Sequence, residues 1–227
     1  MTADPSNYGR PKRDGPALRA ITLMAYGRWL LSRNYLEAAR NIVWPIVLND
    51  LNYVGEYWHE STIDFWSSPR NNFRVDSFFI RAAQHHALVE GAVFSRFFGF
   101  NCSMCESQAP QILCTTQEFR KAGEKQGFIV SDLVNGTAVD RSGLDASTLF
   151  ASIFNFDPLA GCNDETFQPC SEPMLRNHNV MADQFRSWVI NAGAAPGKAV
   201  AFGAYPEETT DKDHGMCPIH AVHVITG

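Results

Sequence analysis

Apolar residues recur at helical spacing along most of the chain, and this pattern predicts a series of long amphipathic helices. Asp14 and Asp145 precede two of the apolar runs and are expected to be N-caps, since aspartate accepts hydrogen bonds from the first free backbone N–H groups. Pro45 should kink or split the second helix. The predicted helices cover about 14–34, 35–60, 77–98, 107–122, 145–154 and 171–190.

The segments between these helices are predicted to be loops. Residues 61–76 are polar, and residues 131–144 are rich in Gly, Ser and Asp after a short extended piece at Ile129-Val130. No stretch has the alternation of a convincing β-ladder, so the fold class is predicted to be all-α. Residues 209–227 show neither periodicity and are predicted to be a divergent, unstructured tail.

Composition excludes several classes of protein. Hydrophobic residues make up 45% of the 227 positions and aromatic residues 12%, which excludes intrinsic disorder. No window approaches the roughly 20 apolar residues of a membrane span. The net charge of −5 and the lack of Lys/Arg clusters argue against nucleic acid as the main partner. Residues 1–20 lack the apolar core of a signal peptide, so either the protein is intracellular or its true N-terminus is absent.

Six cysteines give limited information by themselves. The Cys102-x-x-Cys105 pair is compatible with a redox pair, half a zinc site or a short disulfide, and we favour the disulfide. A cysteine and three histidines in the tail have a spacing that fits no standard zinc finger, so no metal and no cofactor are expected; they are His214, Cys217, His220 and His223. Asn101 and Asn135 begin N-glycosylation sequons.

Six stretches carry a resemblance to a known family. They read GRPKRDGPALRA (9–20), IVWPIVLNDLNYVGEYW (42–58), QHHALVEG (84–91), CSMCESQAPQILC (102–114), FNFDPLAGCNDETFQPCS (154–171) and AFGAYPEE (201–208). In order and spacing they resemble the catalytic domain of fungal-type glucoamylases, the glucan 1,4-alpha-glucosidases of glycoside hydrolase family 15. The resemblance covers about residues 7–208.

The resemblance implies a fold, a reaction and a location. The fold is an (α/α)6 toroid, of which this chain would supply a middle segment with about half of the helices. Family members are secreted and release glucose from the non-reducing ends of starch and malto-oligosaccharides with inversion, so the implied partner is an α-glucan. Inversion needs a general acid and a general base roughly 6.5–9.5 Å apart. The general base of the family is not expected within these residues.

The general acid of the family lies in an Asp-x-Trp-Glu-Glu signature, which this chain matches as Asp64-Phe65-Trp66-Ser67-Ser68. Asp64 and Ser67 therefore mark the catalytic position, with Ser67 in place of the acid and Ser68 in place of a substrate-binding Glu. A serine hydroxyl supplies no proton near neutral pH, so we expect negligible turnover. Three carboxylates flank the position as poorly aimed replacements: Glu60, Asp64 and Asp76.

The resemblance also implies binding residues and cross-links. Ala204 stands where the family has a sugar-binding Arg, and Tyr8 where it has a stacking Trp. The implied substrate-binding residues are Tyr8, Arg10, Trp58, Trp66, Tyr205 and Glu207, with Asp14 also retained. The implied disulfides are Cys102–Cys105 and Cys162–Cys170, while the family partner of Cys114 lies beyond this chain.

Purely structural roles remain open for several of these residues. Taken without the family, Trp58 on an apolar helix face is more often a core residue than a sugar platform. Asp14 is explained as an N-cap, and His85-His86 in mid-helix as packing or surface residues. Asp64-x-Trp66 in a polar loop is the best functional candidate.

Three hypotheses follow for the chain as a whole. It is an enzymatically inactive relative, a non-catalytic glucan-binding module, or a truncated or wrongly spliced product. The last is suggested by the abrupt character of both anomalies, residues 67–76 and the tail after Glu208. The sequence makes no prediction about the oligomeric state.

Overall fold

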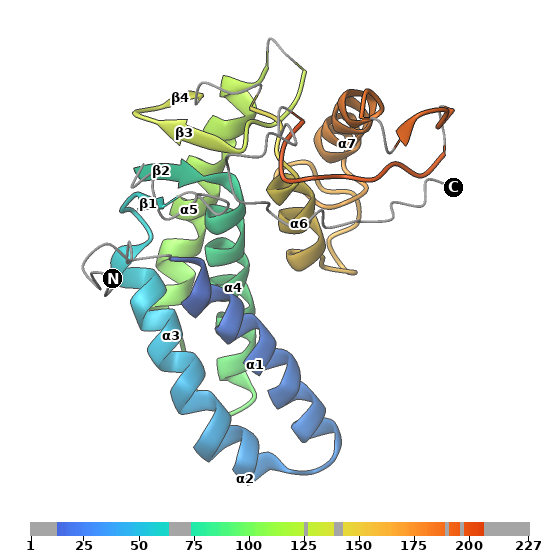
Figure 1. Cartoon of the computed structure of the whole chain (residues 1–227). Helices are drawn as coiled ribbons and strands as arrows, with labels where there is room; N and C mark the ends of the chain where they lie inside the picture. The colour runs from blue at the N-terminus through green and yellow to red at the C-terminus, as the bar shows by residue number, and fades with distance from the viewer. Residues whose placement is uncertain are drawn as a thin grey trace, which may run out of the picture. The chain divides into compact units, whose positions relative to one another are not determined.

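The computed structural model describes residues 13–63, 74–124, 127–138, 143–188, 191–195 and 198–206. The chain divides into two compact units, residues 1–117 and 118–227, which are considered separately below. Long helices dominate unit 1, whereas unit 2 combines two shorter helices, a hairpin and loops (Figure 1). In the described part of the chain, no helix is long and apolar enough to cross a bilayer.

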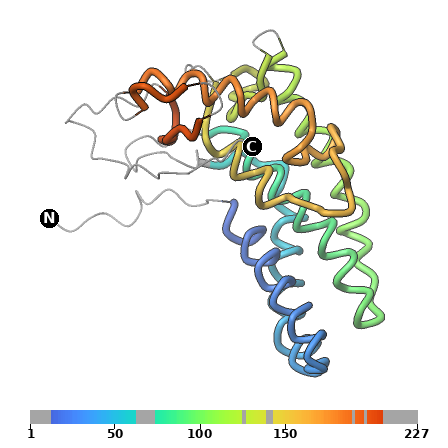
Figure 2. Tube along the Cα trace, turned by 90° about the vertical axis from the view of Figure 1, so that its right-hand side faces the viewer, coloured from blue at the N-terminus to red at the C-terminus, as the bar shows by residue number. Residues whose placement is uncertain are grey.

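Unit 1 is built on long helices that run side by side in both views (Figures 1 and 2). α1 and α3 form a helical hairpin, and α1 packs against both α3 and α4. Its elements are α1 (Asp14–Ser32), α2 (Leu36–Ala38), the π-helical turn η2 (Ala39–Val43), α3 (Trp44–Tyr57), β1 (Thr62–Ile63), β2 (Arg74–Ser77), α4 (Phe78–Arg96) and most of α5 (Ser103–Ala122).

The core of unit 1 is formed by one face of each long helix, as the helical spacing of apolar residues predicts. α1 contributes small residues, so neighbouring helices approach it closely at Gly27, which faces the buried ring of Phe94. Fully buried members of this core include Ala17, Ala20 and Met24 of α1, Val47 and Leu51 of α3, Ala87 and Leu88 of α4, and Cys105 and Ile112 of α5.

Pro45 neither breaks nor sharply ends the second helix. Residues 36–57 are helical throughout, and the wide π-helical turn η2 lies directly before Pro45, which occupies the first turn of α3. Proline lacks the N–H of the α-helical ladder, and a first turn is where that loss matters least. A π-turn is the common way to change hydrogen-bond register inside a helix. The expected kink is therefore realised as a π-bulge.

Two other helix starts differ from the predictions. Asp14 is the first residue of α1 and not its N-cap; Arg13 precedes it, with no side-chain capping bond. The carboxylate still lies in the first turn, where the helix dipole favours negative charge. α5 begins at Ser103, not at 107, because the first turn includes the cysteine pair: the Glu106 N–H donates to the carbonyl of Cys102 at 3.1 Å.

The prediction that no β-ladder exists is wrong. β1 and β2 pair antiparallel with Thr62 opposite Val75. In unit 2, β3 (Asp132–Val134) and β4 (Thr137–Ala138) form a second hairpin within a segment predicted to be loop. Its two-residue turn is Asn135-Gly136, both with positive φ (50° and 75°), which is the typical type I′ sequence. Strands this short leave almost no period-2 signal, and the Asn-Gly turn was the available clue.

Unit 2 contains α6 (Ser147–Phe154) and α7 (Glu172–Phe185), joined by a loop that the Cys162–Cys170 disulfide closes. The N-cap of α6 is Ala146 and not the predicted Asp145, which lies one residue earlier; its carboxylate still accepts a hydrogen bond from the Ser147 N–H at 2.7 Å. α7 ends at Phe185, short of the expected 190. A small core forms between these elements and the segment 198–206; its buried members are Ala146, Met181, Phe185, Val200 and Phe202.

The close helix contact at Gly27 gives a stability prediction. A Cβ at this position would overlap the ring of Phe94, which is fully buried and cannot swing into solvent. Gly27→Ala should therefore lower the free energy of unfolding by about 1–3 kcal/mol. Gly15→Ala in the same helix is the control, because nothing lies within 4 Å of its added Cβ. Urea denaturation should show the control unchanged or slightly stabilised; equal loss in both variants would contradict the packing argument.

Candidate functional site

The structure describes only part of the predicted site. Trp58 lies in unit 1 and Tyr205 in unit 2. The other predicted site residues lie outside the described residues: Tyr8, Arg10, Asp64, Trp66, Ser67 and Glu207. The described surroundings of Trp58 and of the two flanks of 64–73 therefore provide the geometry of the candidate site.

Trp58 directly follows α3 and is half-buried against the core of unit 1. Its indole Nε1–H donates a hydrogen bond to the side-chain oxygen of Gln108 on α5 at 2.7 Å. The guanidinium carbon of Arg81 lies 5.4 Å from the ring centroid. Trp58 therefore packs on the core, as its structural interpretation predicts, and part of its ring stays exposed.

Arg81 lies in the first turn of α4 and is only 7% exposed. Its Nη2 donates to the carboxylate of Asp76 on β2 at 2.7 Å. Burial lowers the pKa of Arg81 from its usual value, the charge of Asp76 opposes that shift, and the positive charge of Arg13 adds to it. Two buried cations therefore lie in one corner of unit 1.

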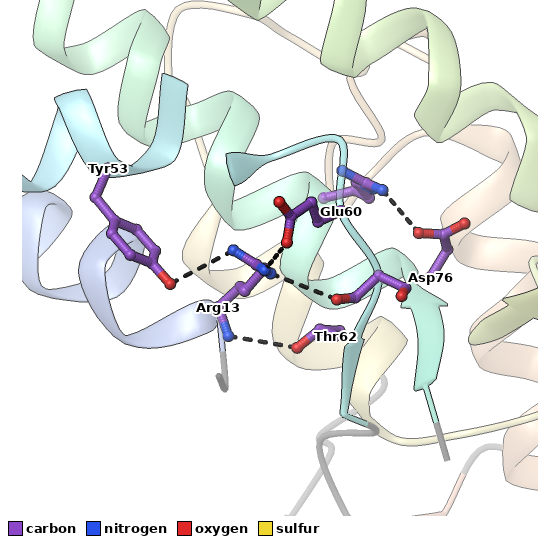
Figure 3. A network of polar contacts seen from close by, with 7 residues as sticks. Arg13, Tyr53, Glu60, Thr62 and Asp76 are labelled. Atoms are coloured by element: carbon purple, nitrogen blue, oxygen red, sulfur yellow. Dashed lines mark hydrogen bonds and ion pairs between the residues drawn. The ribbon is translucent and has the colours of Figure 1, made fainter. Parts of the chain in front are cut away.

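Arg13 joins the start of α1 to the segment that enters β1 (Figure 3). Its side chain is 4% exposed and donates to the carbonyl of Ser61, at 3.4 Å, and to the Glu60 carboxylate. Its backbone N–H donates to the hydroxyl of Thr62 at 3.3 Å. The guanidinium also contacts two tyrosines of α3, with Tyr53 Oη 3.5 Å away and the Tyr57 ring centroid 5.2 Å away.

Together the two arginines hold both flanks of residues 64–73. Arg13 binds the segment 60–62, and Arg81 binds Asp76 on β2. The β1–β2 pairing brings these flanks side by side. The segment that resembles the general-acid signature therefore lies between two short strands whose pairing fixes its two ends. Neither arginine was singled out from sequence, because a buried arginine has no periodic signature.

The two described carboxylates that flank the general-acid position, Glu60 and Asp76, both form ion pairs. Glu60 pairs with Arg13, and Asp76 pairs with Arg81. Carboxylates in such pairs accept hydrogen bonds from the guanidinium, which is the opposite of the proton donation that a general acid performs. Neither arrangement provides a proton source for glycoside cleavage.

His85-His86 in the middle of α4 fits the expected structural role. Burial lowers the pKa of His85 to about 4, and the neighbouring His86 adds to the shift. A histidine with this pKa is neutral at pH 7. It is a packing residue of α4.

Unit 2 contains a separate apolar cavity of about 180 Å³. Its walls include Phe150 of α6, Met174 and His178 of α7, and Phe202. Burial lowers the pKa of His178, whose ring stacks on Phe202 with centroids 6.2 Å apart. No acidic residue lines the cavity, so it does not provide the carboxyl pair of a glycosidase.

Tyr205 and Ala204 belong to the last described segment of unit 2. Ala204 is buried, and its carbonyl accepts a hydrogen bond from the Ala146 N–H at 2.8 Å. Trp188 donates its indole N–H to the carbonyl of Pro206 at 3.0 Å. These bonds fix the backbone on either side of half-buried Tyr205. An alanine at 204 provides no cation for a sugar.

The remaining predicted sites are placed as follows. Cys102–Cys105 and Cys162–Cys170 are disulfides, the pairs that the resemblance implies. Cys114 is an exposed free thiol. Asn101 and Asn135 are both exposed. Among the described residues, no group of three or more His, Cys, Asp or Glu side chains could hold a metal ion; the histidines of the tail lie outside this part of the chain.

Comparison with known proteins identifies the family. The sequence model of glycosyl hydrolases family 15 matches residues 2–216. The chain belongs to this family. It is 48% identical over 201 residues to a glucoamylase of Neurospora crassa, covering 88% of this chain and 30% of that protein. Glucoamylase-1 of Arthroderma benhamiae is 46% identical over 209 residues, with 89% and 31% covered.

Solved family 15 structures share the fold. The Hypocrea jecorina glucoamylase superposes with a TM-score of 0.80 at 44% identity, over 88% of this chain and 32% of the other. The Hormoconis resinae glucoamylase gives a TM-score of 0.79 at 42% identity, over 89% and 33%. The chain therefore spans about a third of the length of these relatives and is part of an (α/α)6 barrel. The resemblance and the fold class inferred from sequence are confirmed.

Arg13 should contribute measurably to the stability of this family 15 segment. Arg13→Met removes the side-chain donor shared by the Ser61 carbonyl, the Tyr53 hydroxyl and the Glu60 carboxylate. The free energy of unfolding should therefore fall by about 2 kcal/mol in urea denaturation. Arg13→Lys keeps the charge but not the planar fork, and should recover less than half of the loss.

The control for Arg13 is Arg96→Met. Arg96 also pairs with a glutamate, Glu106, at 2.8 Å, but both side chains are exposed. Its removal should cost less than about 0.5 kcal/mol. If Arg96→Met lowered the free energy of unfolding as much as Arg13→Met, burial of the Arg13 network would add nothing to stability.

The depressed pKa of His85 predicts how stability depends on pH. Below pH 6.5 the unfolded chain protonates this histidine, whereas the folded chain resists protonation down to about pH 4. The unfolded state therefore binds more protons in this window, and the free energy of unfolding falls as the pH falls from 6.5 to 4, by on the order of 2 kcal/mol. His85→Gln should flatten this part of the curve in urea titrations at several pH values. An unchanged slope in His85→Gln would contradict the assignment.

Proposed function

We propose that this chain recognises the non-reducing ends of α-1,4-linked glucans and does not hydrolyse them. The observation that carries the proposal is Ser67 at the position of the general acid of family 15. The relatives are named glucoamylases, and transfer of their substrate class to this chain is part of the proposal.

The loss of catalysis follows from proton chemistry. A general acid typically contributes 10²–10⁴-fold to the rate, and an alcohol does not donate its proton near neutral pH. Inversion also needs a second carboxyl group across the glycosidic bond. Glu60 and Asp76, which border the position, are both committed to arginines.

Binding is supported by the surroundings of Trp58. Aromatic rings bind sugars through their apolar faces, and the indole of Trp58 is half-buried and fixed by Gln108. Residues carried over from the family would complete the site: Tyr8, Arg10, Trp66, Tyr205 and Glu207, with Asp64 beside the substituted acid. Ala204 lacks the cation of the family, so affinity should be weaker than in an intact family member.

Location and modification belong to the same proposal. Two disulfides suit an oxidising compartment, and two exposed asparagines begin sequons. We therefore infer a secreted glycoprotein in which residues 7–208 form the glucoamylase part and 209–227 a separate tail.

Hydrolysis and binding are tested on the same purified polypeptide. Glucose release from maltoheptaose and soluble starch should stay at the level of a buffer blank, and robust release would overturn the claim of inactivity. Ser67→Glu should remain inactive in this polypeptide, because the base of the family lies in a part that these residues do not match. Activity of Ser67→Glu would show that the placement of the base is wrong.

Isothermal titration with maltoheptaose or acarbose should give heat at millimolar ligand. Trp58→Ala should abolish that heat, because it removes the aromatic face. Trp29→Phe is the control, since this exposed tryptophan lies about 22 Å along α1 from Asp14, at 1.5 Å per residue. Absence of heat in the unaltered chain would remove the binding proposal.

Transcript sequencing across residues 66–77 and 208–209 would then decide whether the chain is a mis-spliced product.

A further inference from the structure

We propose that Arg81 is a positioning residue that holds the indole ring of Trp58 in place through a contact between its guanidinium and the ring face. The glucan-binding consequence rests on the proposed function, but the positioning itself is a property of the free protein. Trp58 and Arg81 come from the end of α3 and the start of α4, two elements that pack against each other in unit 1.

Burial removes water from the guanidinium of Arg81, and hydrogen bonds replace only part of that lost hydration. Its Nη2 reaches Asp76 at 2.7 Å, but its Nη1 is buried and has no hydrogen-bond partner among the described residues. The same helix face also carries buried, unpartnered oxygens on Ser77 and Gln84, at spacings of four and three residues from Arg81. No acceptor on this face satisfies the second guanidinium nitrogen.

The aromatic ring provides the missing compensation. The guanidinium carbon is 5.4 Å from the Trp58 centroid, within the range of a cation–π interaction. Tryptophan is the best aromatic partner, and the interaction is strongest where the cation is desolvated. Arg81 at 7% exposure meets that condition.

The same contact restrains the tryptophan. Gln108 holds the edge of the indole through the Nε1–H bond of 2.7 Å, and the backbone N–H of Trp58 donates to the Val54 carbonyl at 2.9 Å. Neither bond prevents the ring from tilting about the Nε1 position. The planar guanidinium does, because tilting would separate the buried charge from the π-face. A ring held in this way loses little freedom when a sugar stacks on it.

A simpler role for Arg81 is to close the ion pair with Asp76. The two roles differ in which substitution releases the indole. If only the ion pair matters, Asp76→Asn and Arg81→Met should free Trp58 equally. If the cation itself holds the ring, Asp76→Asn should leave Trp58 in place while Arg81→Met releases it.

The first measurement is made without ligand. Indole N–H resonances of ¹⁵N-tryptophan-labelled protein are recorded, and that of Trp58 is assigned by its loss in Trp58→Phe. Arg81→Met should shift this resonance and speed its hydrogen exchange by about tenfold, which corresponds to loss of a desolvated cation–π contact. Asp76→Asn should change the exchange rate by less than about twofold, by the same reasoning. An unchanged exchange rate in Arg81→Met, or equal release in both variants, overturns the proposal.

The matched control is Arg28→Met. Arg28 also lies over an aromatic ring, at 5.9 Å from the Phe94 centroid, and also pairs with a carboxylate, that of Glu90. Its loss should leave the Trp58 resonance unmoved; a comparable release of Trp58 would show a general loosening of unit 1 and overturn the proposal. If Arg81→Met does not fold, Arg81→Lys, which keeps a cation, should retain slow exchange within about threefold, and faster exchange than that contradicts the role of the cation.

The second measurement separates this inference from the proposed function. Arg81→Met should weaken maltoheptaose binding about fivefold, with Arg81→Lys restoring most of it. Faster indole exchange without any glucan binding in the unaltered chain supports the positioning role and removes the glucan role. Unchanged affinity in Arg81→Met, in a chain that does bind glucan, overturns the link between ring position and binding.

Discussion

The burial of two arginines in one corner of unit 1 is the constraint on which the candidate site depends. Arg13 and Arg81 are 4% and 7% exposed, and burial lowers the pKa of Arg81, with the charge of Arg13 adding to the shift. Each cation must therefore recruit groups to replace its lost hydration. Arg13 recruits the segment 60–62 and the tyrosines of α3, and Arg81 recruits Asp76 and the ring of Trp58.

This requirement explains why a short β-hairpin exists in a mainly helical unit. The connection between α3 and α4 must supply acceptors for both guanidinium groups, and it does so from Glu60 and Ser61 on one side and Asp76 on the other. The β1–β2 pairing fixes the separation of these acceptors. These paired strands flank the segment that resembles the general-acid signature on both sides.

The two units are stabilised in different ways. Unit 1 relies on close packing of long helices, with glycine at Gly27 and Gly91 permitting contact with Phe94 and Leu51. Unit 2 has less regular structure and relies more on polar side chains that bond to backbone: Asn191 bonds to residues 185 and 201, and Asn177 to Ile129. Several large apolar residues of unit 1 remain exposed, including Trp29 and Ile42 at 50% and 65%. Exposed apolar faces are consistent with a segment that spans about a third of its relatives.

The sequence alone predicted most of the helices and identified the family, and the resemblance placed Ser67 where the family has its general acid. Helical periodicity is a local signal, so the predicted bounds of α1, of the helical run 36–57 and of α4 agree with the structure to within a few residues. The tertiary structure decided the two hairpins, the π-bulge before Pro45, the start of α5 inside the cysteine pair, and the partners of Arg13 and Arg81. Some of these features are local but too short to leave a clear pattern, such as the Asn135-Gly136 hairpin and the Arg81–Asp76 pair. Others join residues about 50 positions apart, as for Arg13 with Thr62 and Trp58 with Gln108, and no short-range pattern records which distant group will satisfy a buried charge or an indole N–H.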